Sequence, residues 1–151
     1  MRWPDEAACA ATASSLATRT ALVDAFVELH GLLGAGKTTF VRHLLLSLGV
    51  EGRVKSPTYT LMEPYTADAM HGGFAIAHFD FYRFDDAQEW EDAGFREIFA
   101  NPGLKLVEWP EKAAELLPRC DLRLVIAPDD EGTLRRVRIE AMTARGEELL
   151  S

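Results

Sequence analysis

The sequence lacks most features of secreted and membrane-spanning proteins. Its only cysteines, Cys9 and Cys120, lie far apart and form no CxxC pair, which favours free thiols in a reducing compartment over a disulfide. No apolar run approaches the roughly 20 residues that span a bilayer. The first residues include Asp5 and Glu6 and no compact hydrophobic block, unlike a secretory signal. We therefore expect a soluble cytoplasmic protein that has no membrane partner.

Positive charge is also scarce. The chain has 24 acidic and 16 basic residues, a formal net charge of −8, and it contains no long basic run. Because gripping a nucleic-acid backbone takes clustered Lys and Arg, we do not expect the chain to bind nucleic acid by itself. Its four histidines show no HxxxH or HExxH spacing, which disfavours a zinc site.

The length and the apolar content fit one domain. The chain has 151 residues, 48% of them hydrophobic, and no linker-like stretch divides it. The pattern predicts a helix from Asp5 to about Thr20, a buried strand over residues 25–30, and a helix through residues 40–48 that ends at Gly49. The later segments are a loop running into a strand in SPTYTLMEPY, a strand over 74–80, a helix broken at 94, a strand over 104–109, a short helix in PEKAAELLP, and two strands joined by PDDEG.

The stretch HGLLGAGKTTF, residues 30–40, has the spacing of a phosphate-binding loop. It matches GxxxxGK[ST] at every fixed position and lies between a predicted strand and a predicted helix. Glycines let backbone amides surround an anion, and the helix adds the positive end of its dipole. We predict an ATP or ADP site in which Lys37 binds the β- and γ-phosphates and Thr38 binds Mg²⁺. The predicted nucleotide-binding residues are Gly34, Ala35, Gly36, Lys37, Thr38 and Thr39.

The order of these segments predicts the fold class. Strands alternate with helices, which favours an α/β protein. Together with the loop, this predicts a single phosphate-loop (P-loop) NTPase-type domain over residues 1–151. We expect a three-layer sandwich with a mostly parallel central sheet, and antiparallel strands toward the C-terminal end.

Two acids end predicted strands. Asp80 lies where P-loop enzymes keep an acid that holds Mg²⁺, although a turn aspartate is the plainer alternative. Glu108 is placed to orient or deprotonate a water or to assist the metal, unless it is a surface glutamate. The predicted catalytic residues are therefore Lys37, Asp80 and Glu108, and the predicted metal ligands are Thr38, Asp80 and Glu108. Trp109, beside Glu108, is expected to pack in the core or to form a contact surface.

Five further polar residues have two interpretations each. Ser56, Thr58 and Thr60 lie where nucleotide switches sense the γ-phosphate, but hydroxyls near a proline are also ordinary turn residues. Arg83 and Arg96 are candidates to stabilise transferred charge, or they pair with nearby acids in solvent.

Taken together, the segments resemble one family. The chain contains LHGLLGAGKTTFVRHLLLSLG, SPTYTL, HFDFYRF, AGFREIF and LVEWPEKAAELLP in the order and spacing of the TsaE (formerly YjeE) ATPases of bacterial tRNA threonylcarbamoyladenosine biosynthesis. Many unrelated enzymes share the loop, whereas SPTYTL, HFDFYR and EWPE are far more selective. The resemblance runs from about residue 5 to residue 146.

The resemblance implies a small ATPase with two partner proteins, TsaB and TsaD. These partners transfer the threonylcarbamoyl group to the adenosine beside the tRNA anticodon, so the chain would meet tRNA only indirectly, through the complex. In the family pattern, residues 34–39 form the nucleotide loop and Thr38 binds Mg²⁺. Asp80 is the second acid, Glu108 the late glutamate, and residues 56–61 a switch-like segment.

The chain departs from the family pattern at two positions. Leu32 stands where the family usually has an aspartate after the first loop glycine, so one charge near the phosphates is missing and nucleotide affinity or hydrolysis is expected to change. Cys9 aligns with a threonine that contacts the nucleotide. A late nucleotide-contacting arginine of the family matches either Arg135 or Arg136.

The residues and the resemblance together predict an ATP hydrolase that is slow without its partners, because no arginine is obviously delivered to the γ-phosphate within the chain. One alternative is a small-molecule kinase, which needs an arginine-rich lid, yet the one arginine cluster, LRRVR, is predicted to be a strand. The other alternative is a non-enzymatic switch that binds ATP only to set a protein interface.

Overall fold

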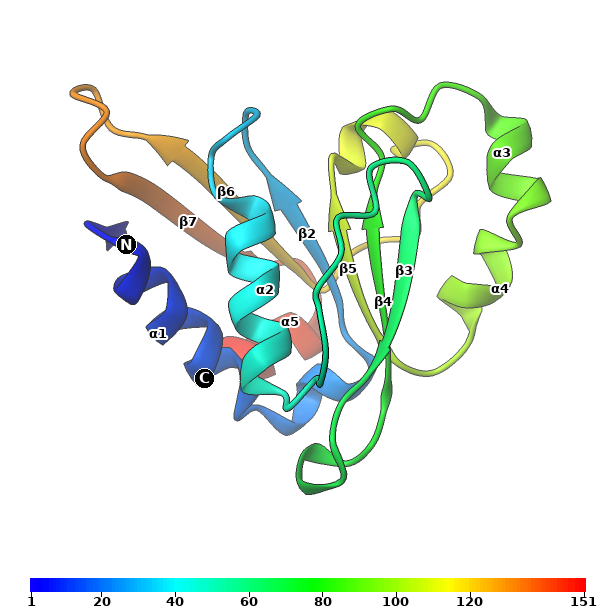
Figure 1. The fold of residues 1–151 in the computed structure, drawn as a ribbon, viewed down its shortest axis with the longest axis horizontal. Coiled ribbons are helices and arrows are strands. Elements are labelled where there is room, and N and C mark those ends of the chain that lie inside the picture. The colour runs from blue at the N-terminus through cyan, green and yellow to red at the C-terminus, as the bar shows by residue number, and fades with distance from the viewer.

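A single seven-stranded sheet runs through the computed structural model, which describes residues 1–151 (Figure 1). Its strands are β1 (Arg2–Trp3), β2 (Phe26–His30), β3 (Met62–Thr66), β4 (Ala75–Asp80), β5 (Leu104–Glu108), β6 (Leu122–Pro128) and β7 (Arg135–Ala141). They are ordered β1-β7-β6-β2-β5-β4-β3. The four central strands, β6, β2, β5 and β4, are parallel, and antiparallel strands flank them at both edges.

Helices and short 3₁₀ turns connect the strands. The helices are α1 (Glu6–Ala17), α2 (Lys37–Ser47), α3 (Ala87–Asp92), α4 (Phe95–Ala100) and α5 (Ala144–Leu150), and the 3₁₀ turns are η1 (Thr20–Asp24), η2 (Ala69–His71) and η3 (Pro110–Ala113). None of the helices has the length and apolar composition needed to cross a bilayer.

Local chemistry explains where the first two helices begin and end. The side chain of Asp5 accepts a hydrogen bond from the Ala8 amide, and this caps the start of α1. Helix α2 starts directly after Gly36, whose φ of 112° is in the left-handed region that favours glycine. It ends before Gly49, which has a φ of 75°. Both boundaries agree with the sequence prediction to within a few residues.

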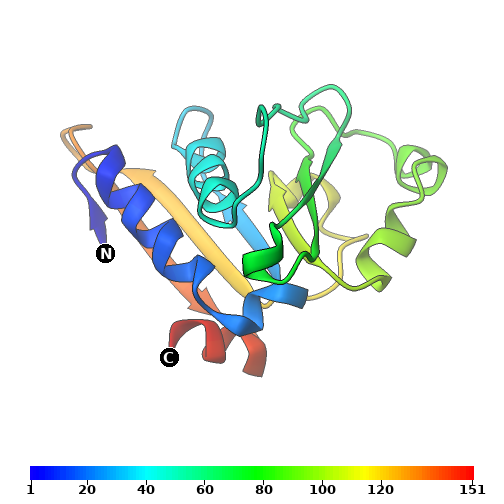
Figure 2. The same cartoon turned by 60° about the horizontal axis from the view of Figure 1, so that its bottom comes forward.

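The two faces of the sheet carry different cores. Helices α1 and α2 pack against each other on one face (Figures 1 and 2), over aliphatic residues such as Val27 and Leu106. The neighbouring residues of the same strands point to the opposite face. There they form, with α3, α4 and η3, an aromatic cluster of Phe26, Leu61, Ala77, Phe79, Phe81, Phe84, Trp90, Phe95, Val107, Ala113 and Cys120.

The predicted parallel core is present, but the sheet is more mixed than the sequence indicated. Antiparallel strands occur at both edges, not only toward the C-terminal end. Strand β3 is antiparallel to β4 because only eight residues, 67–74, connect them, too few for the crossover that parallel strands need. Strand β1, of two residues, and helix α5 were not predicted, and the expected helix after β5 is the 3₁₀ turn η3.

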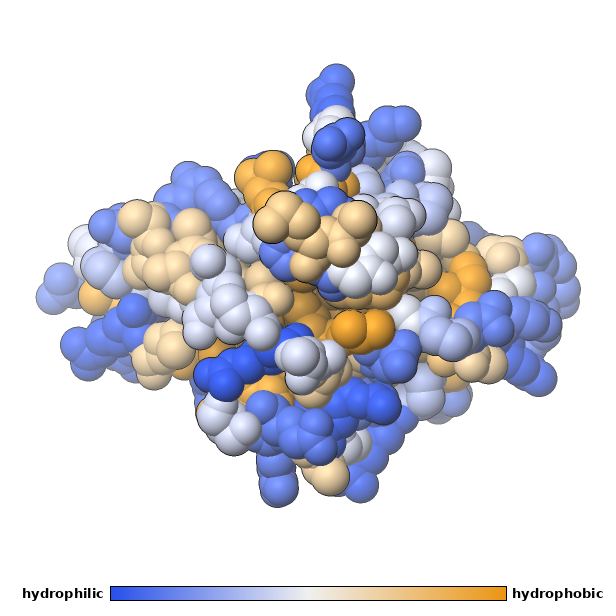
Figure 3. Space-filling view, turned by 90° about the horizontal axis from the view of Figure 1, so that it is seen from below, coloured by the Kyte–Doolittle hydropathy of each residue, from blue (hydrophilic) through white to orange (hydrophobic).

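The carboxyl ends of the parallel strands lie together at the top of Figure 1, beside the loop between β2 and α2. Figure 3 shows the opposite side of the molecule from below, with hydrophilic residues around its rim and hydrophobic groups between them. The residues predicted to bind nucleotide and metal lie at the carboxyl ends of the strands.

Candidate functional site

The glycine-rich loop occupies residues 31–36, between the end of β2 and the start of α2. A side chain at Gly31 would place its Cβ 2.6 Å from the carbonyl oxygen of Ile126 on β6, so only glycine fits there. Gly36 immediately precedes the helix, and the amides of its first turn have no partner within the helix. The start of the helix therefore provides free backbone donors for an anion, whereas the Ala35 amide of the loop donates to the Leu32 carbonyl over 3.0 Å.

Lys37 is buried at the start of α2, and its ammonium folds back over the loop. It donates to the carbonyl oxygens of Gly31 and Leu32 and lies 4.0 Å from the centroid of the Trp109 ring. Burial lowers the pKa of Lys37, while the nearby carboxylates of Glu108, Glu111 and Asp80 oppose that shift. The ammonium is therefore hydrogen-bonded to uncharged carbonyl groups, and three carboxylates lie nearby.

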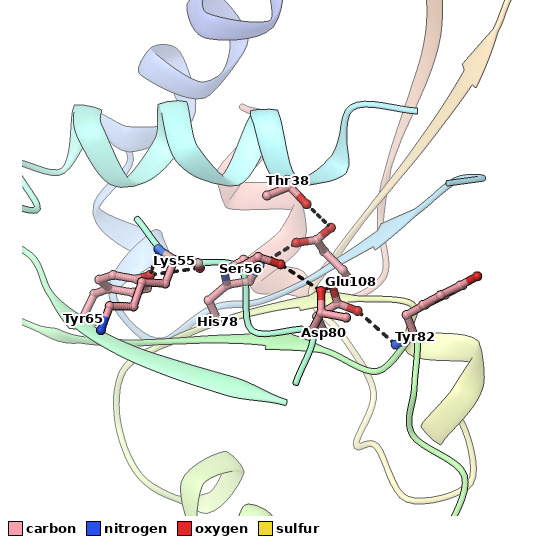
Figure 4. A network of polar contacts seen from close by, with 9 residues as sticks. Thr38, Lys55, Ser56, Tyr65, His78, Asp80, Tyr82 and Glu108 are labelled. Carbon is pink, nitrogen blue, oxygen red and sulfur yellow. Dashed lines mark hydrogen bonds and ion pairs between the residues drawn. The ribbon is translucent and has the colours of Figure 1, made fainter. Parts of the chain in front are cut away.

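A buried chain of hydrogen bonds joins α2 to strands β5 and β4 (Figure 4). The hydroxyl of Thr38 donates to Oε1 of Glu108 over 2.7 Å, and Oε2 of Glu108 lies 2.6 Å from Nε2 of His78. The residue Glu108 is 2% exposed and His78 is 0% exposed. Both oxygens of the Glu108 carboxylate therefore have a partner.

Asp80 lies opposite Glu108 in the register of β4 and β5. Its Oδ1 accepts the amide of Tyr82 over 2.9 Å, and its Oδ2 accepts the hydroxyl of Thr58 over 3.3 Å. Burial raises the pKa of the Asp80 carboxyl; Glu108 raises it further, and these two hydrogen bonds oppose the shift. The Thr58 hydroxyl also lies 2.8 Å from that of Ser56, so one hydroxyl of the predicted switch-like segment binds this acid and a second is linked to it through Thr58.

One cleft of about 320 Å³ brings these groups together. It is lined by Leu33, Gly34, Ala35, Gly36, Lys37, Thr38, Thr39, Ser56, Thr58, Asp80, Glu108 and Trp109. All the residues predicted for nucleotide, metal and catalysis therefore line the same cavity. Trp109, predicted to pack or to form a contact surface, packs against the aromatic cluster and against Tyr82, with ring centres 4.9 Å apart, and its ring also contacts the Lys37 ammonium. Its backbone is left-handed, with a φ of 55°.

The oxygen atoms in the cleft are suited to bind Mg²⁺ that is also coordinated by phosphate oxygens. No group of three or more His, Cys, Asp and Glu in the chain has metal-binding geometry. Mg²⁺ seldom takes an all-protein cage and usually binds one or two carboxylates, waters and phosphate oxygens. The Thr38 hydroxyl with the carboxylates of Asp80 and Glu108 is a hard oxygen set of that kind.

A second cleft, also of about 320 Å³, shares the loop residues Gly34, Ala35, Gly36 and Thr39 with the first. Arg135 lines it and donates from Nε to the Ala35 carbonyl over 3.0 Å, whereas Arg136 pairs with Asp130 at the surface. The structure thus distinguishes two arginines that the sequence left equivalent. Cys9 also lines this cleft, and burial, with Glu6, raises the pKa of its thiol to about 11.

Four residues singled out in the sequence line neither of the two clefts. Thr60 donates to Glu63, and Arg96 pairs with Glu91, so both interact locally. Arg83 stacks on the ring of Tyr59 at 4.8 Å. Leu32, which stands where the resemblance leads us to expect an aspartate, is 72% exposed.

Sequence reasoning missed two residues of the network. His78 was not singled out because one histidine in an apolar strand matches no metal-binding or catalytic motif. Tyr65 of β3 was also missed: its hydroxyl accepts the amide of Lys55 over 2.9 Å and donates to the Lys55 carbonyl over 3.3 Å, just before Ser56 (Figure 4). The alternation along β4, which puts His78 and Asp80 on one face, was the available signal for the first.

Comparisons with known proteins give a consistent result. A family model described as "Threonylcarbamoyl adenosine biosynthesis protein TsaE" matches residues 3–137. A Haemophilus influenzae protein, named tRNA threonylcarbamoyladenosine biosynthesis protein TsaE, is 42% identical over 125 residues, which cover 83% of this chain and 75% of that protein. The Bacillus subtilis protein of that name is 42% identical over 107 residues. The match covers 70% of this chain and 64% of the Bacillus subtilis protein, which is less than two thirds of its length.

A solved structure is similar over nearly the whole chain. The crystal structure of Bacillus subtilis YdiB matches with a TM-score of 0.75 and 28% identity, covering 99% of this chain and 89% of that one. The mixed α/β sheet with its helices is therefore an arrangement already known in a related protein.

Proposed function

This chain belongs to the TsaE family of tRNA threonylcarbamoyladenosine biosynthesis proteins, and we propose that it serves that biosynthesis as an ATP hydrolase of the P-loop NTPase type. The observation that carries the proposal is the single cleft in which Lys37 and Thr38 face Asp80 and Glu108. A basic residue and free amides on one side, with two acids on the other, suit a Mg²⁺-bound triphosphate.

The loop binds the phosphates in this proposal. The backbone amides of 34–39 surround the β-phosphate, and Lys37 exchanges its bonds to the carbonyls of Gly31 and Leu32 for phosphate oxygens. Since neutral carbonyls compensate a buried ammonium less well than anionic oxygens do, this exchange favours binding. Arg135 contacts the nucleotide from the adjoining cleft.

The acids and Thr38 act at the metal and at the water. When bound, Mg²⁺ would neutralise charge that develops on the phosphates. Thr38 and Asp80 would hold the metal. With the Thr38 hydroxyl taken up as a metal ligand, Oε1 of Glu108 would be free to position the attacking water. These residues accelerate the reaction by positioning and by charge stabilisation.

The partners are proposed from the family. TsaB and TsaD would carry out the transfer to tRNA, and ATP hydrolysis here would support turnover of their complex. The net charge of −8 agrees with a chain that meets tRNA only through these proteins. Because no arginine lines the phosphate cleft, hydrolysis is expected to be slow until a partner completes the site.

The two alternatives are less well supported. A kinase of the adenylate-kinase type needs a mobile arginine-rich lid, but Arg135, Arg136 and Arg138 lie on strand β7 of the sheet. A pure nucleotide switch needs no residue to position water, yet Glu108 is buried in the cleft with both oxygens bound.

The test is Mg-ATP hydrolysis by the purified chain, alone and with TsaB and TsaD, beside a Lys37→Ala control. We expect a slow rate that depends on Lys37 and that rises with the two partners. If phosphate release by the native chain equals that of Lys37→Ala in both conditions, hydrolysis is not the function and the switch becomes the preferred alternative.

A further inference from the structure

We propose that His78 is a positioning residue that holds one oxygen of Glu108 so that the other faces the cleft. This role rests on the proposed ATP hydrolysis. It assigns a task to a buried histidine that lies outside the phosphate loop and contacts neither the loop nor the cleft-lining hydroxyls.

The contact is short, buried and fixed by the sheet. His78 lies on β4 beside Leu106 of β5, two residues before the pair formed by Asp80 and Glu108. Its Nε2 is 2.6 Å from Oε2 of Glu108, and the two side chains are 0% and 3% exposed. Because an ionised carboxylate can only accept, the hydrogen between them belongs to Nε2 of the histidine.

A packing role alone does not account for His78. Its Nδ1 is buried and has no hydrogen-bond partner. A buried polar atom without a partner is unfavourable, so an aliphatic side chain such as Ile76, on the same face of β4, would suit a packing role better. The histidine therefore offers what an aliphatic residue cannot, a donor aimed at Glu108.

The two oxygens of Glu108 have different partners, and that difference defines the role. Thr38, which binds Oε1, is a proposed metal ligand and leaves that oxygen when substrate arrives. His78 has no other partner and keeps Oε2. His78 then fixes Oε2, while Oε1 is free to accept a hydrogen bond from a water molecule. The fixed oxygen keeps the carboxylate from rotating out of the cleft.

Two substitutions at one position test the role in the full-length chain. His78→Gln keeps a donor near the position of Nε2, and His78→Leu removes it while retaining an apolar fit. We expect His78→Leu to lower kcat for Mg-ATP hydrolysis by about 10- to 100-fold with KM nearly unchanged, and His78→Gln to restore most of the rate. Equal kcat for His78→Leu and the native chain would overturn the proposal while leaving ATP hydrolysis intact.

A second measurement does not depend on activity. Long-range ¹H–¹⁵N NMR of the nucleotide-free chain reports which ring nitrogen of His78 carries the hydrogen. We expect the Nε2–H form, with a shift that moves in Glu108→Gln and stays in place in Glu28→Gln. Glu28 is the matched control because its Oε1 lies 2.9 Å from Nε2 of His30 on the other face of the sheet.

The two measurements separate the possible failures. A hydrogen on Nδ1 and none on Nε2, or a His78 signal that does not change in Glu108→Gln, would overturn the positioning role even in an active ATPase. An intact NMR signature in a chain with no Lys37-dependent hydrolysis would overturn the proposed function, and the catalytic role of His78 with it.

Discussion

At the carboxyl ends of strands β4 and β5, alternate residues of the same segments give the two faces of the sheet opposite chemistry. On one face, Phe79 and Val107 belong to the aromatic cluster, where Phe79 lies within 5.1 Å, ring centre to ring centre, of Phe95 and Phe99. On the other face, Asp80 and Glu108 lie buried in the cleft beside the glycine-rich loop. A period of two therefore separates stabilising residues from the proposed functional ones.

The difference shows which buried groups are expected to stabilise the folded state and which to destabilise it. Burying aromatic rings against one another stabilises the folded state. Burying a carboxylate in the cleft opposes folding: burial, and to a smaller extent the neighbouring Glu108, raise the pKa of Asp80. Substitutions on the two faces should therefore have opposite effects on stability and on activity.

The largest expected effect is at the aromatic face. Phe79→Ala removes a fully buried ring and should lower the free energy of unfolding by about 3–5 kcal/mol. Urea denaturation followed by circular dichroism measures it. Tyr59→Ala, at an aromatic residue that is 83% exposed, should stay within about 0.5 kcal/mol of the native chain. Similar losses in both variants would contradict the packing role of Phe79.

The next largest effect is at the cleft, on activity rather than stability. Glu108→Gln should lower kcat for ATP hydrolysis by about 100-fold or more while ADP still binds, because the water loses its base but the phosphate loop is intact. Stopped-flow phosphate release and calorimetric ADP titration give the two values. Glu115→Gln, seven residues later at the surface, is the control and should keep the native rate. A Glu108→Gln chain with native turnover would favour the nucleotide switch.

A smaller effect concerns pH. Because the folded-state pKa of Asp80 is raised, the folded chain binds more protons than the unfolded one, so its free energy of unfolding falls as pH rises above the ordinary Asp range. Asp80→Asn should flatten this fall and stabilise the nucleotide-free chain at pH 7 by about 0.5–2 kcal/mol. Thermal unfolding between pH 4 and 7 without Mg²⁺ checks both. A steeper fall in Asp80→Asn would show that another group is responsible.

The smallest expected effect is at the edge of the sheet. Tyr65→Phe removes two hydrogen bonds to the Lys55 backbone and should weaken that contact by about 0.5–1.5 kcal/mol. Hydrogen exchange at the Lys55 amide should accelerate, while the amides of β4 serve as the internal control. Unchanged protection of Lys55 would mean that other contacts hold the segment before Ser56.

Much of the site could be predicted because its signals are local. The loop at 31–38 is contiguous, and Asp80 and Glu108 each end an apolar run. His78 and Tyr65 could not be found this way, because each acts on a residue distant in sequence, Glu108 and Lys55. The choice of Arg135 over Arg136 depended on which face of β7 meets the loop. Helix α5 and the two-residue β1 were missed because neither has a clear periodic pattern.

The sequence by itself determined the phosphate loop, the parallel central strands with the acids at their ends, and the family, because these depend on contiguous residues and on short-period alternation. Only the tertiary structure decided that Lys37 lies under Trp109, that Glu108 is shared between Thr38 and His78, and that antiparallel strands close both edges of the sheet. The physical reason is that hydrogen bonds and ring contacts depend on distances of a few ångströms between segments. Those distances are set by how strands pair and how helices pack on them.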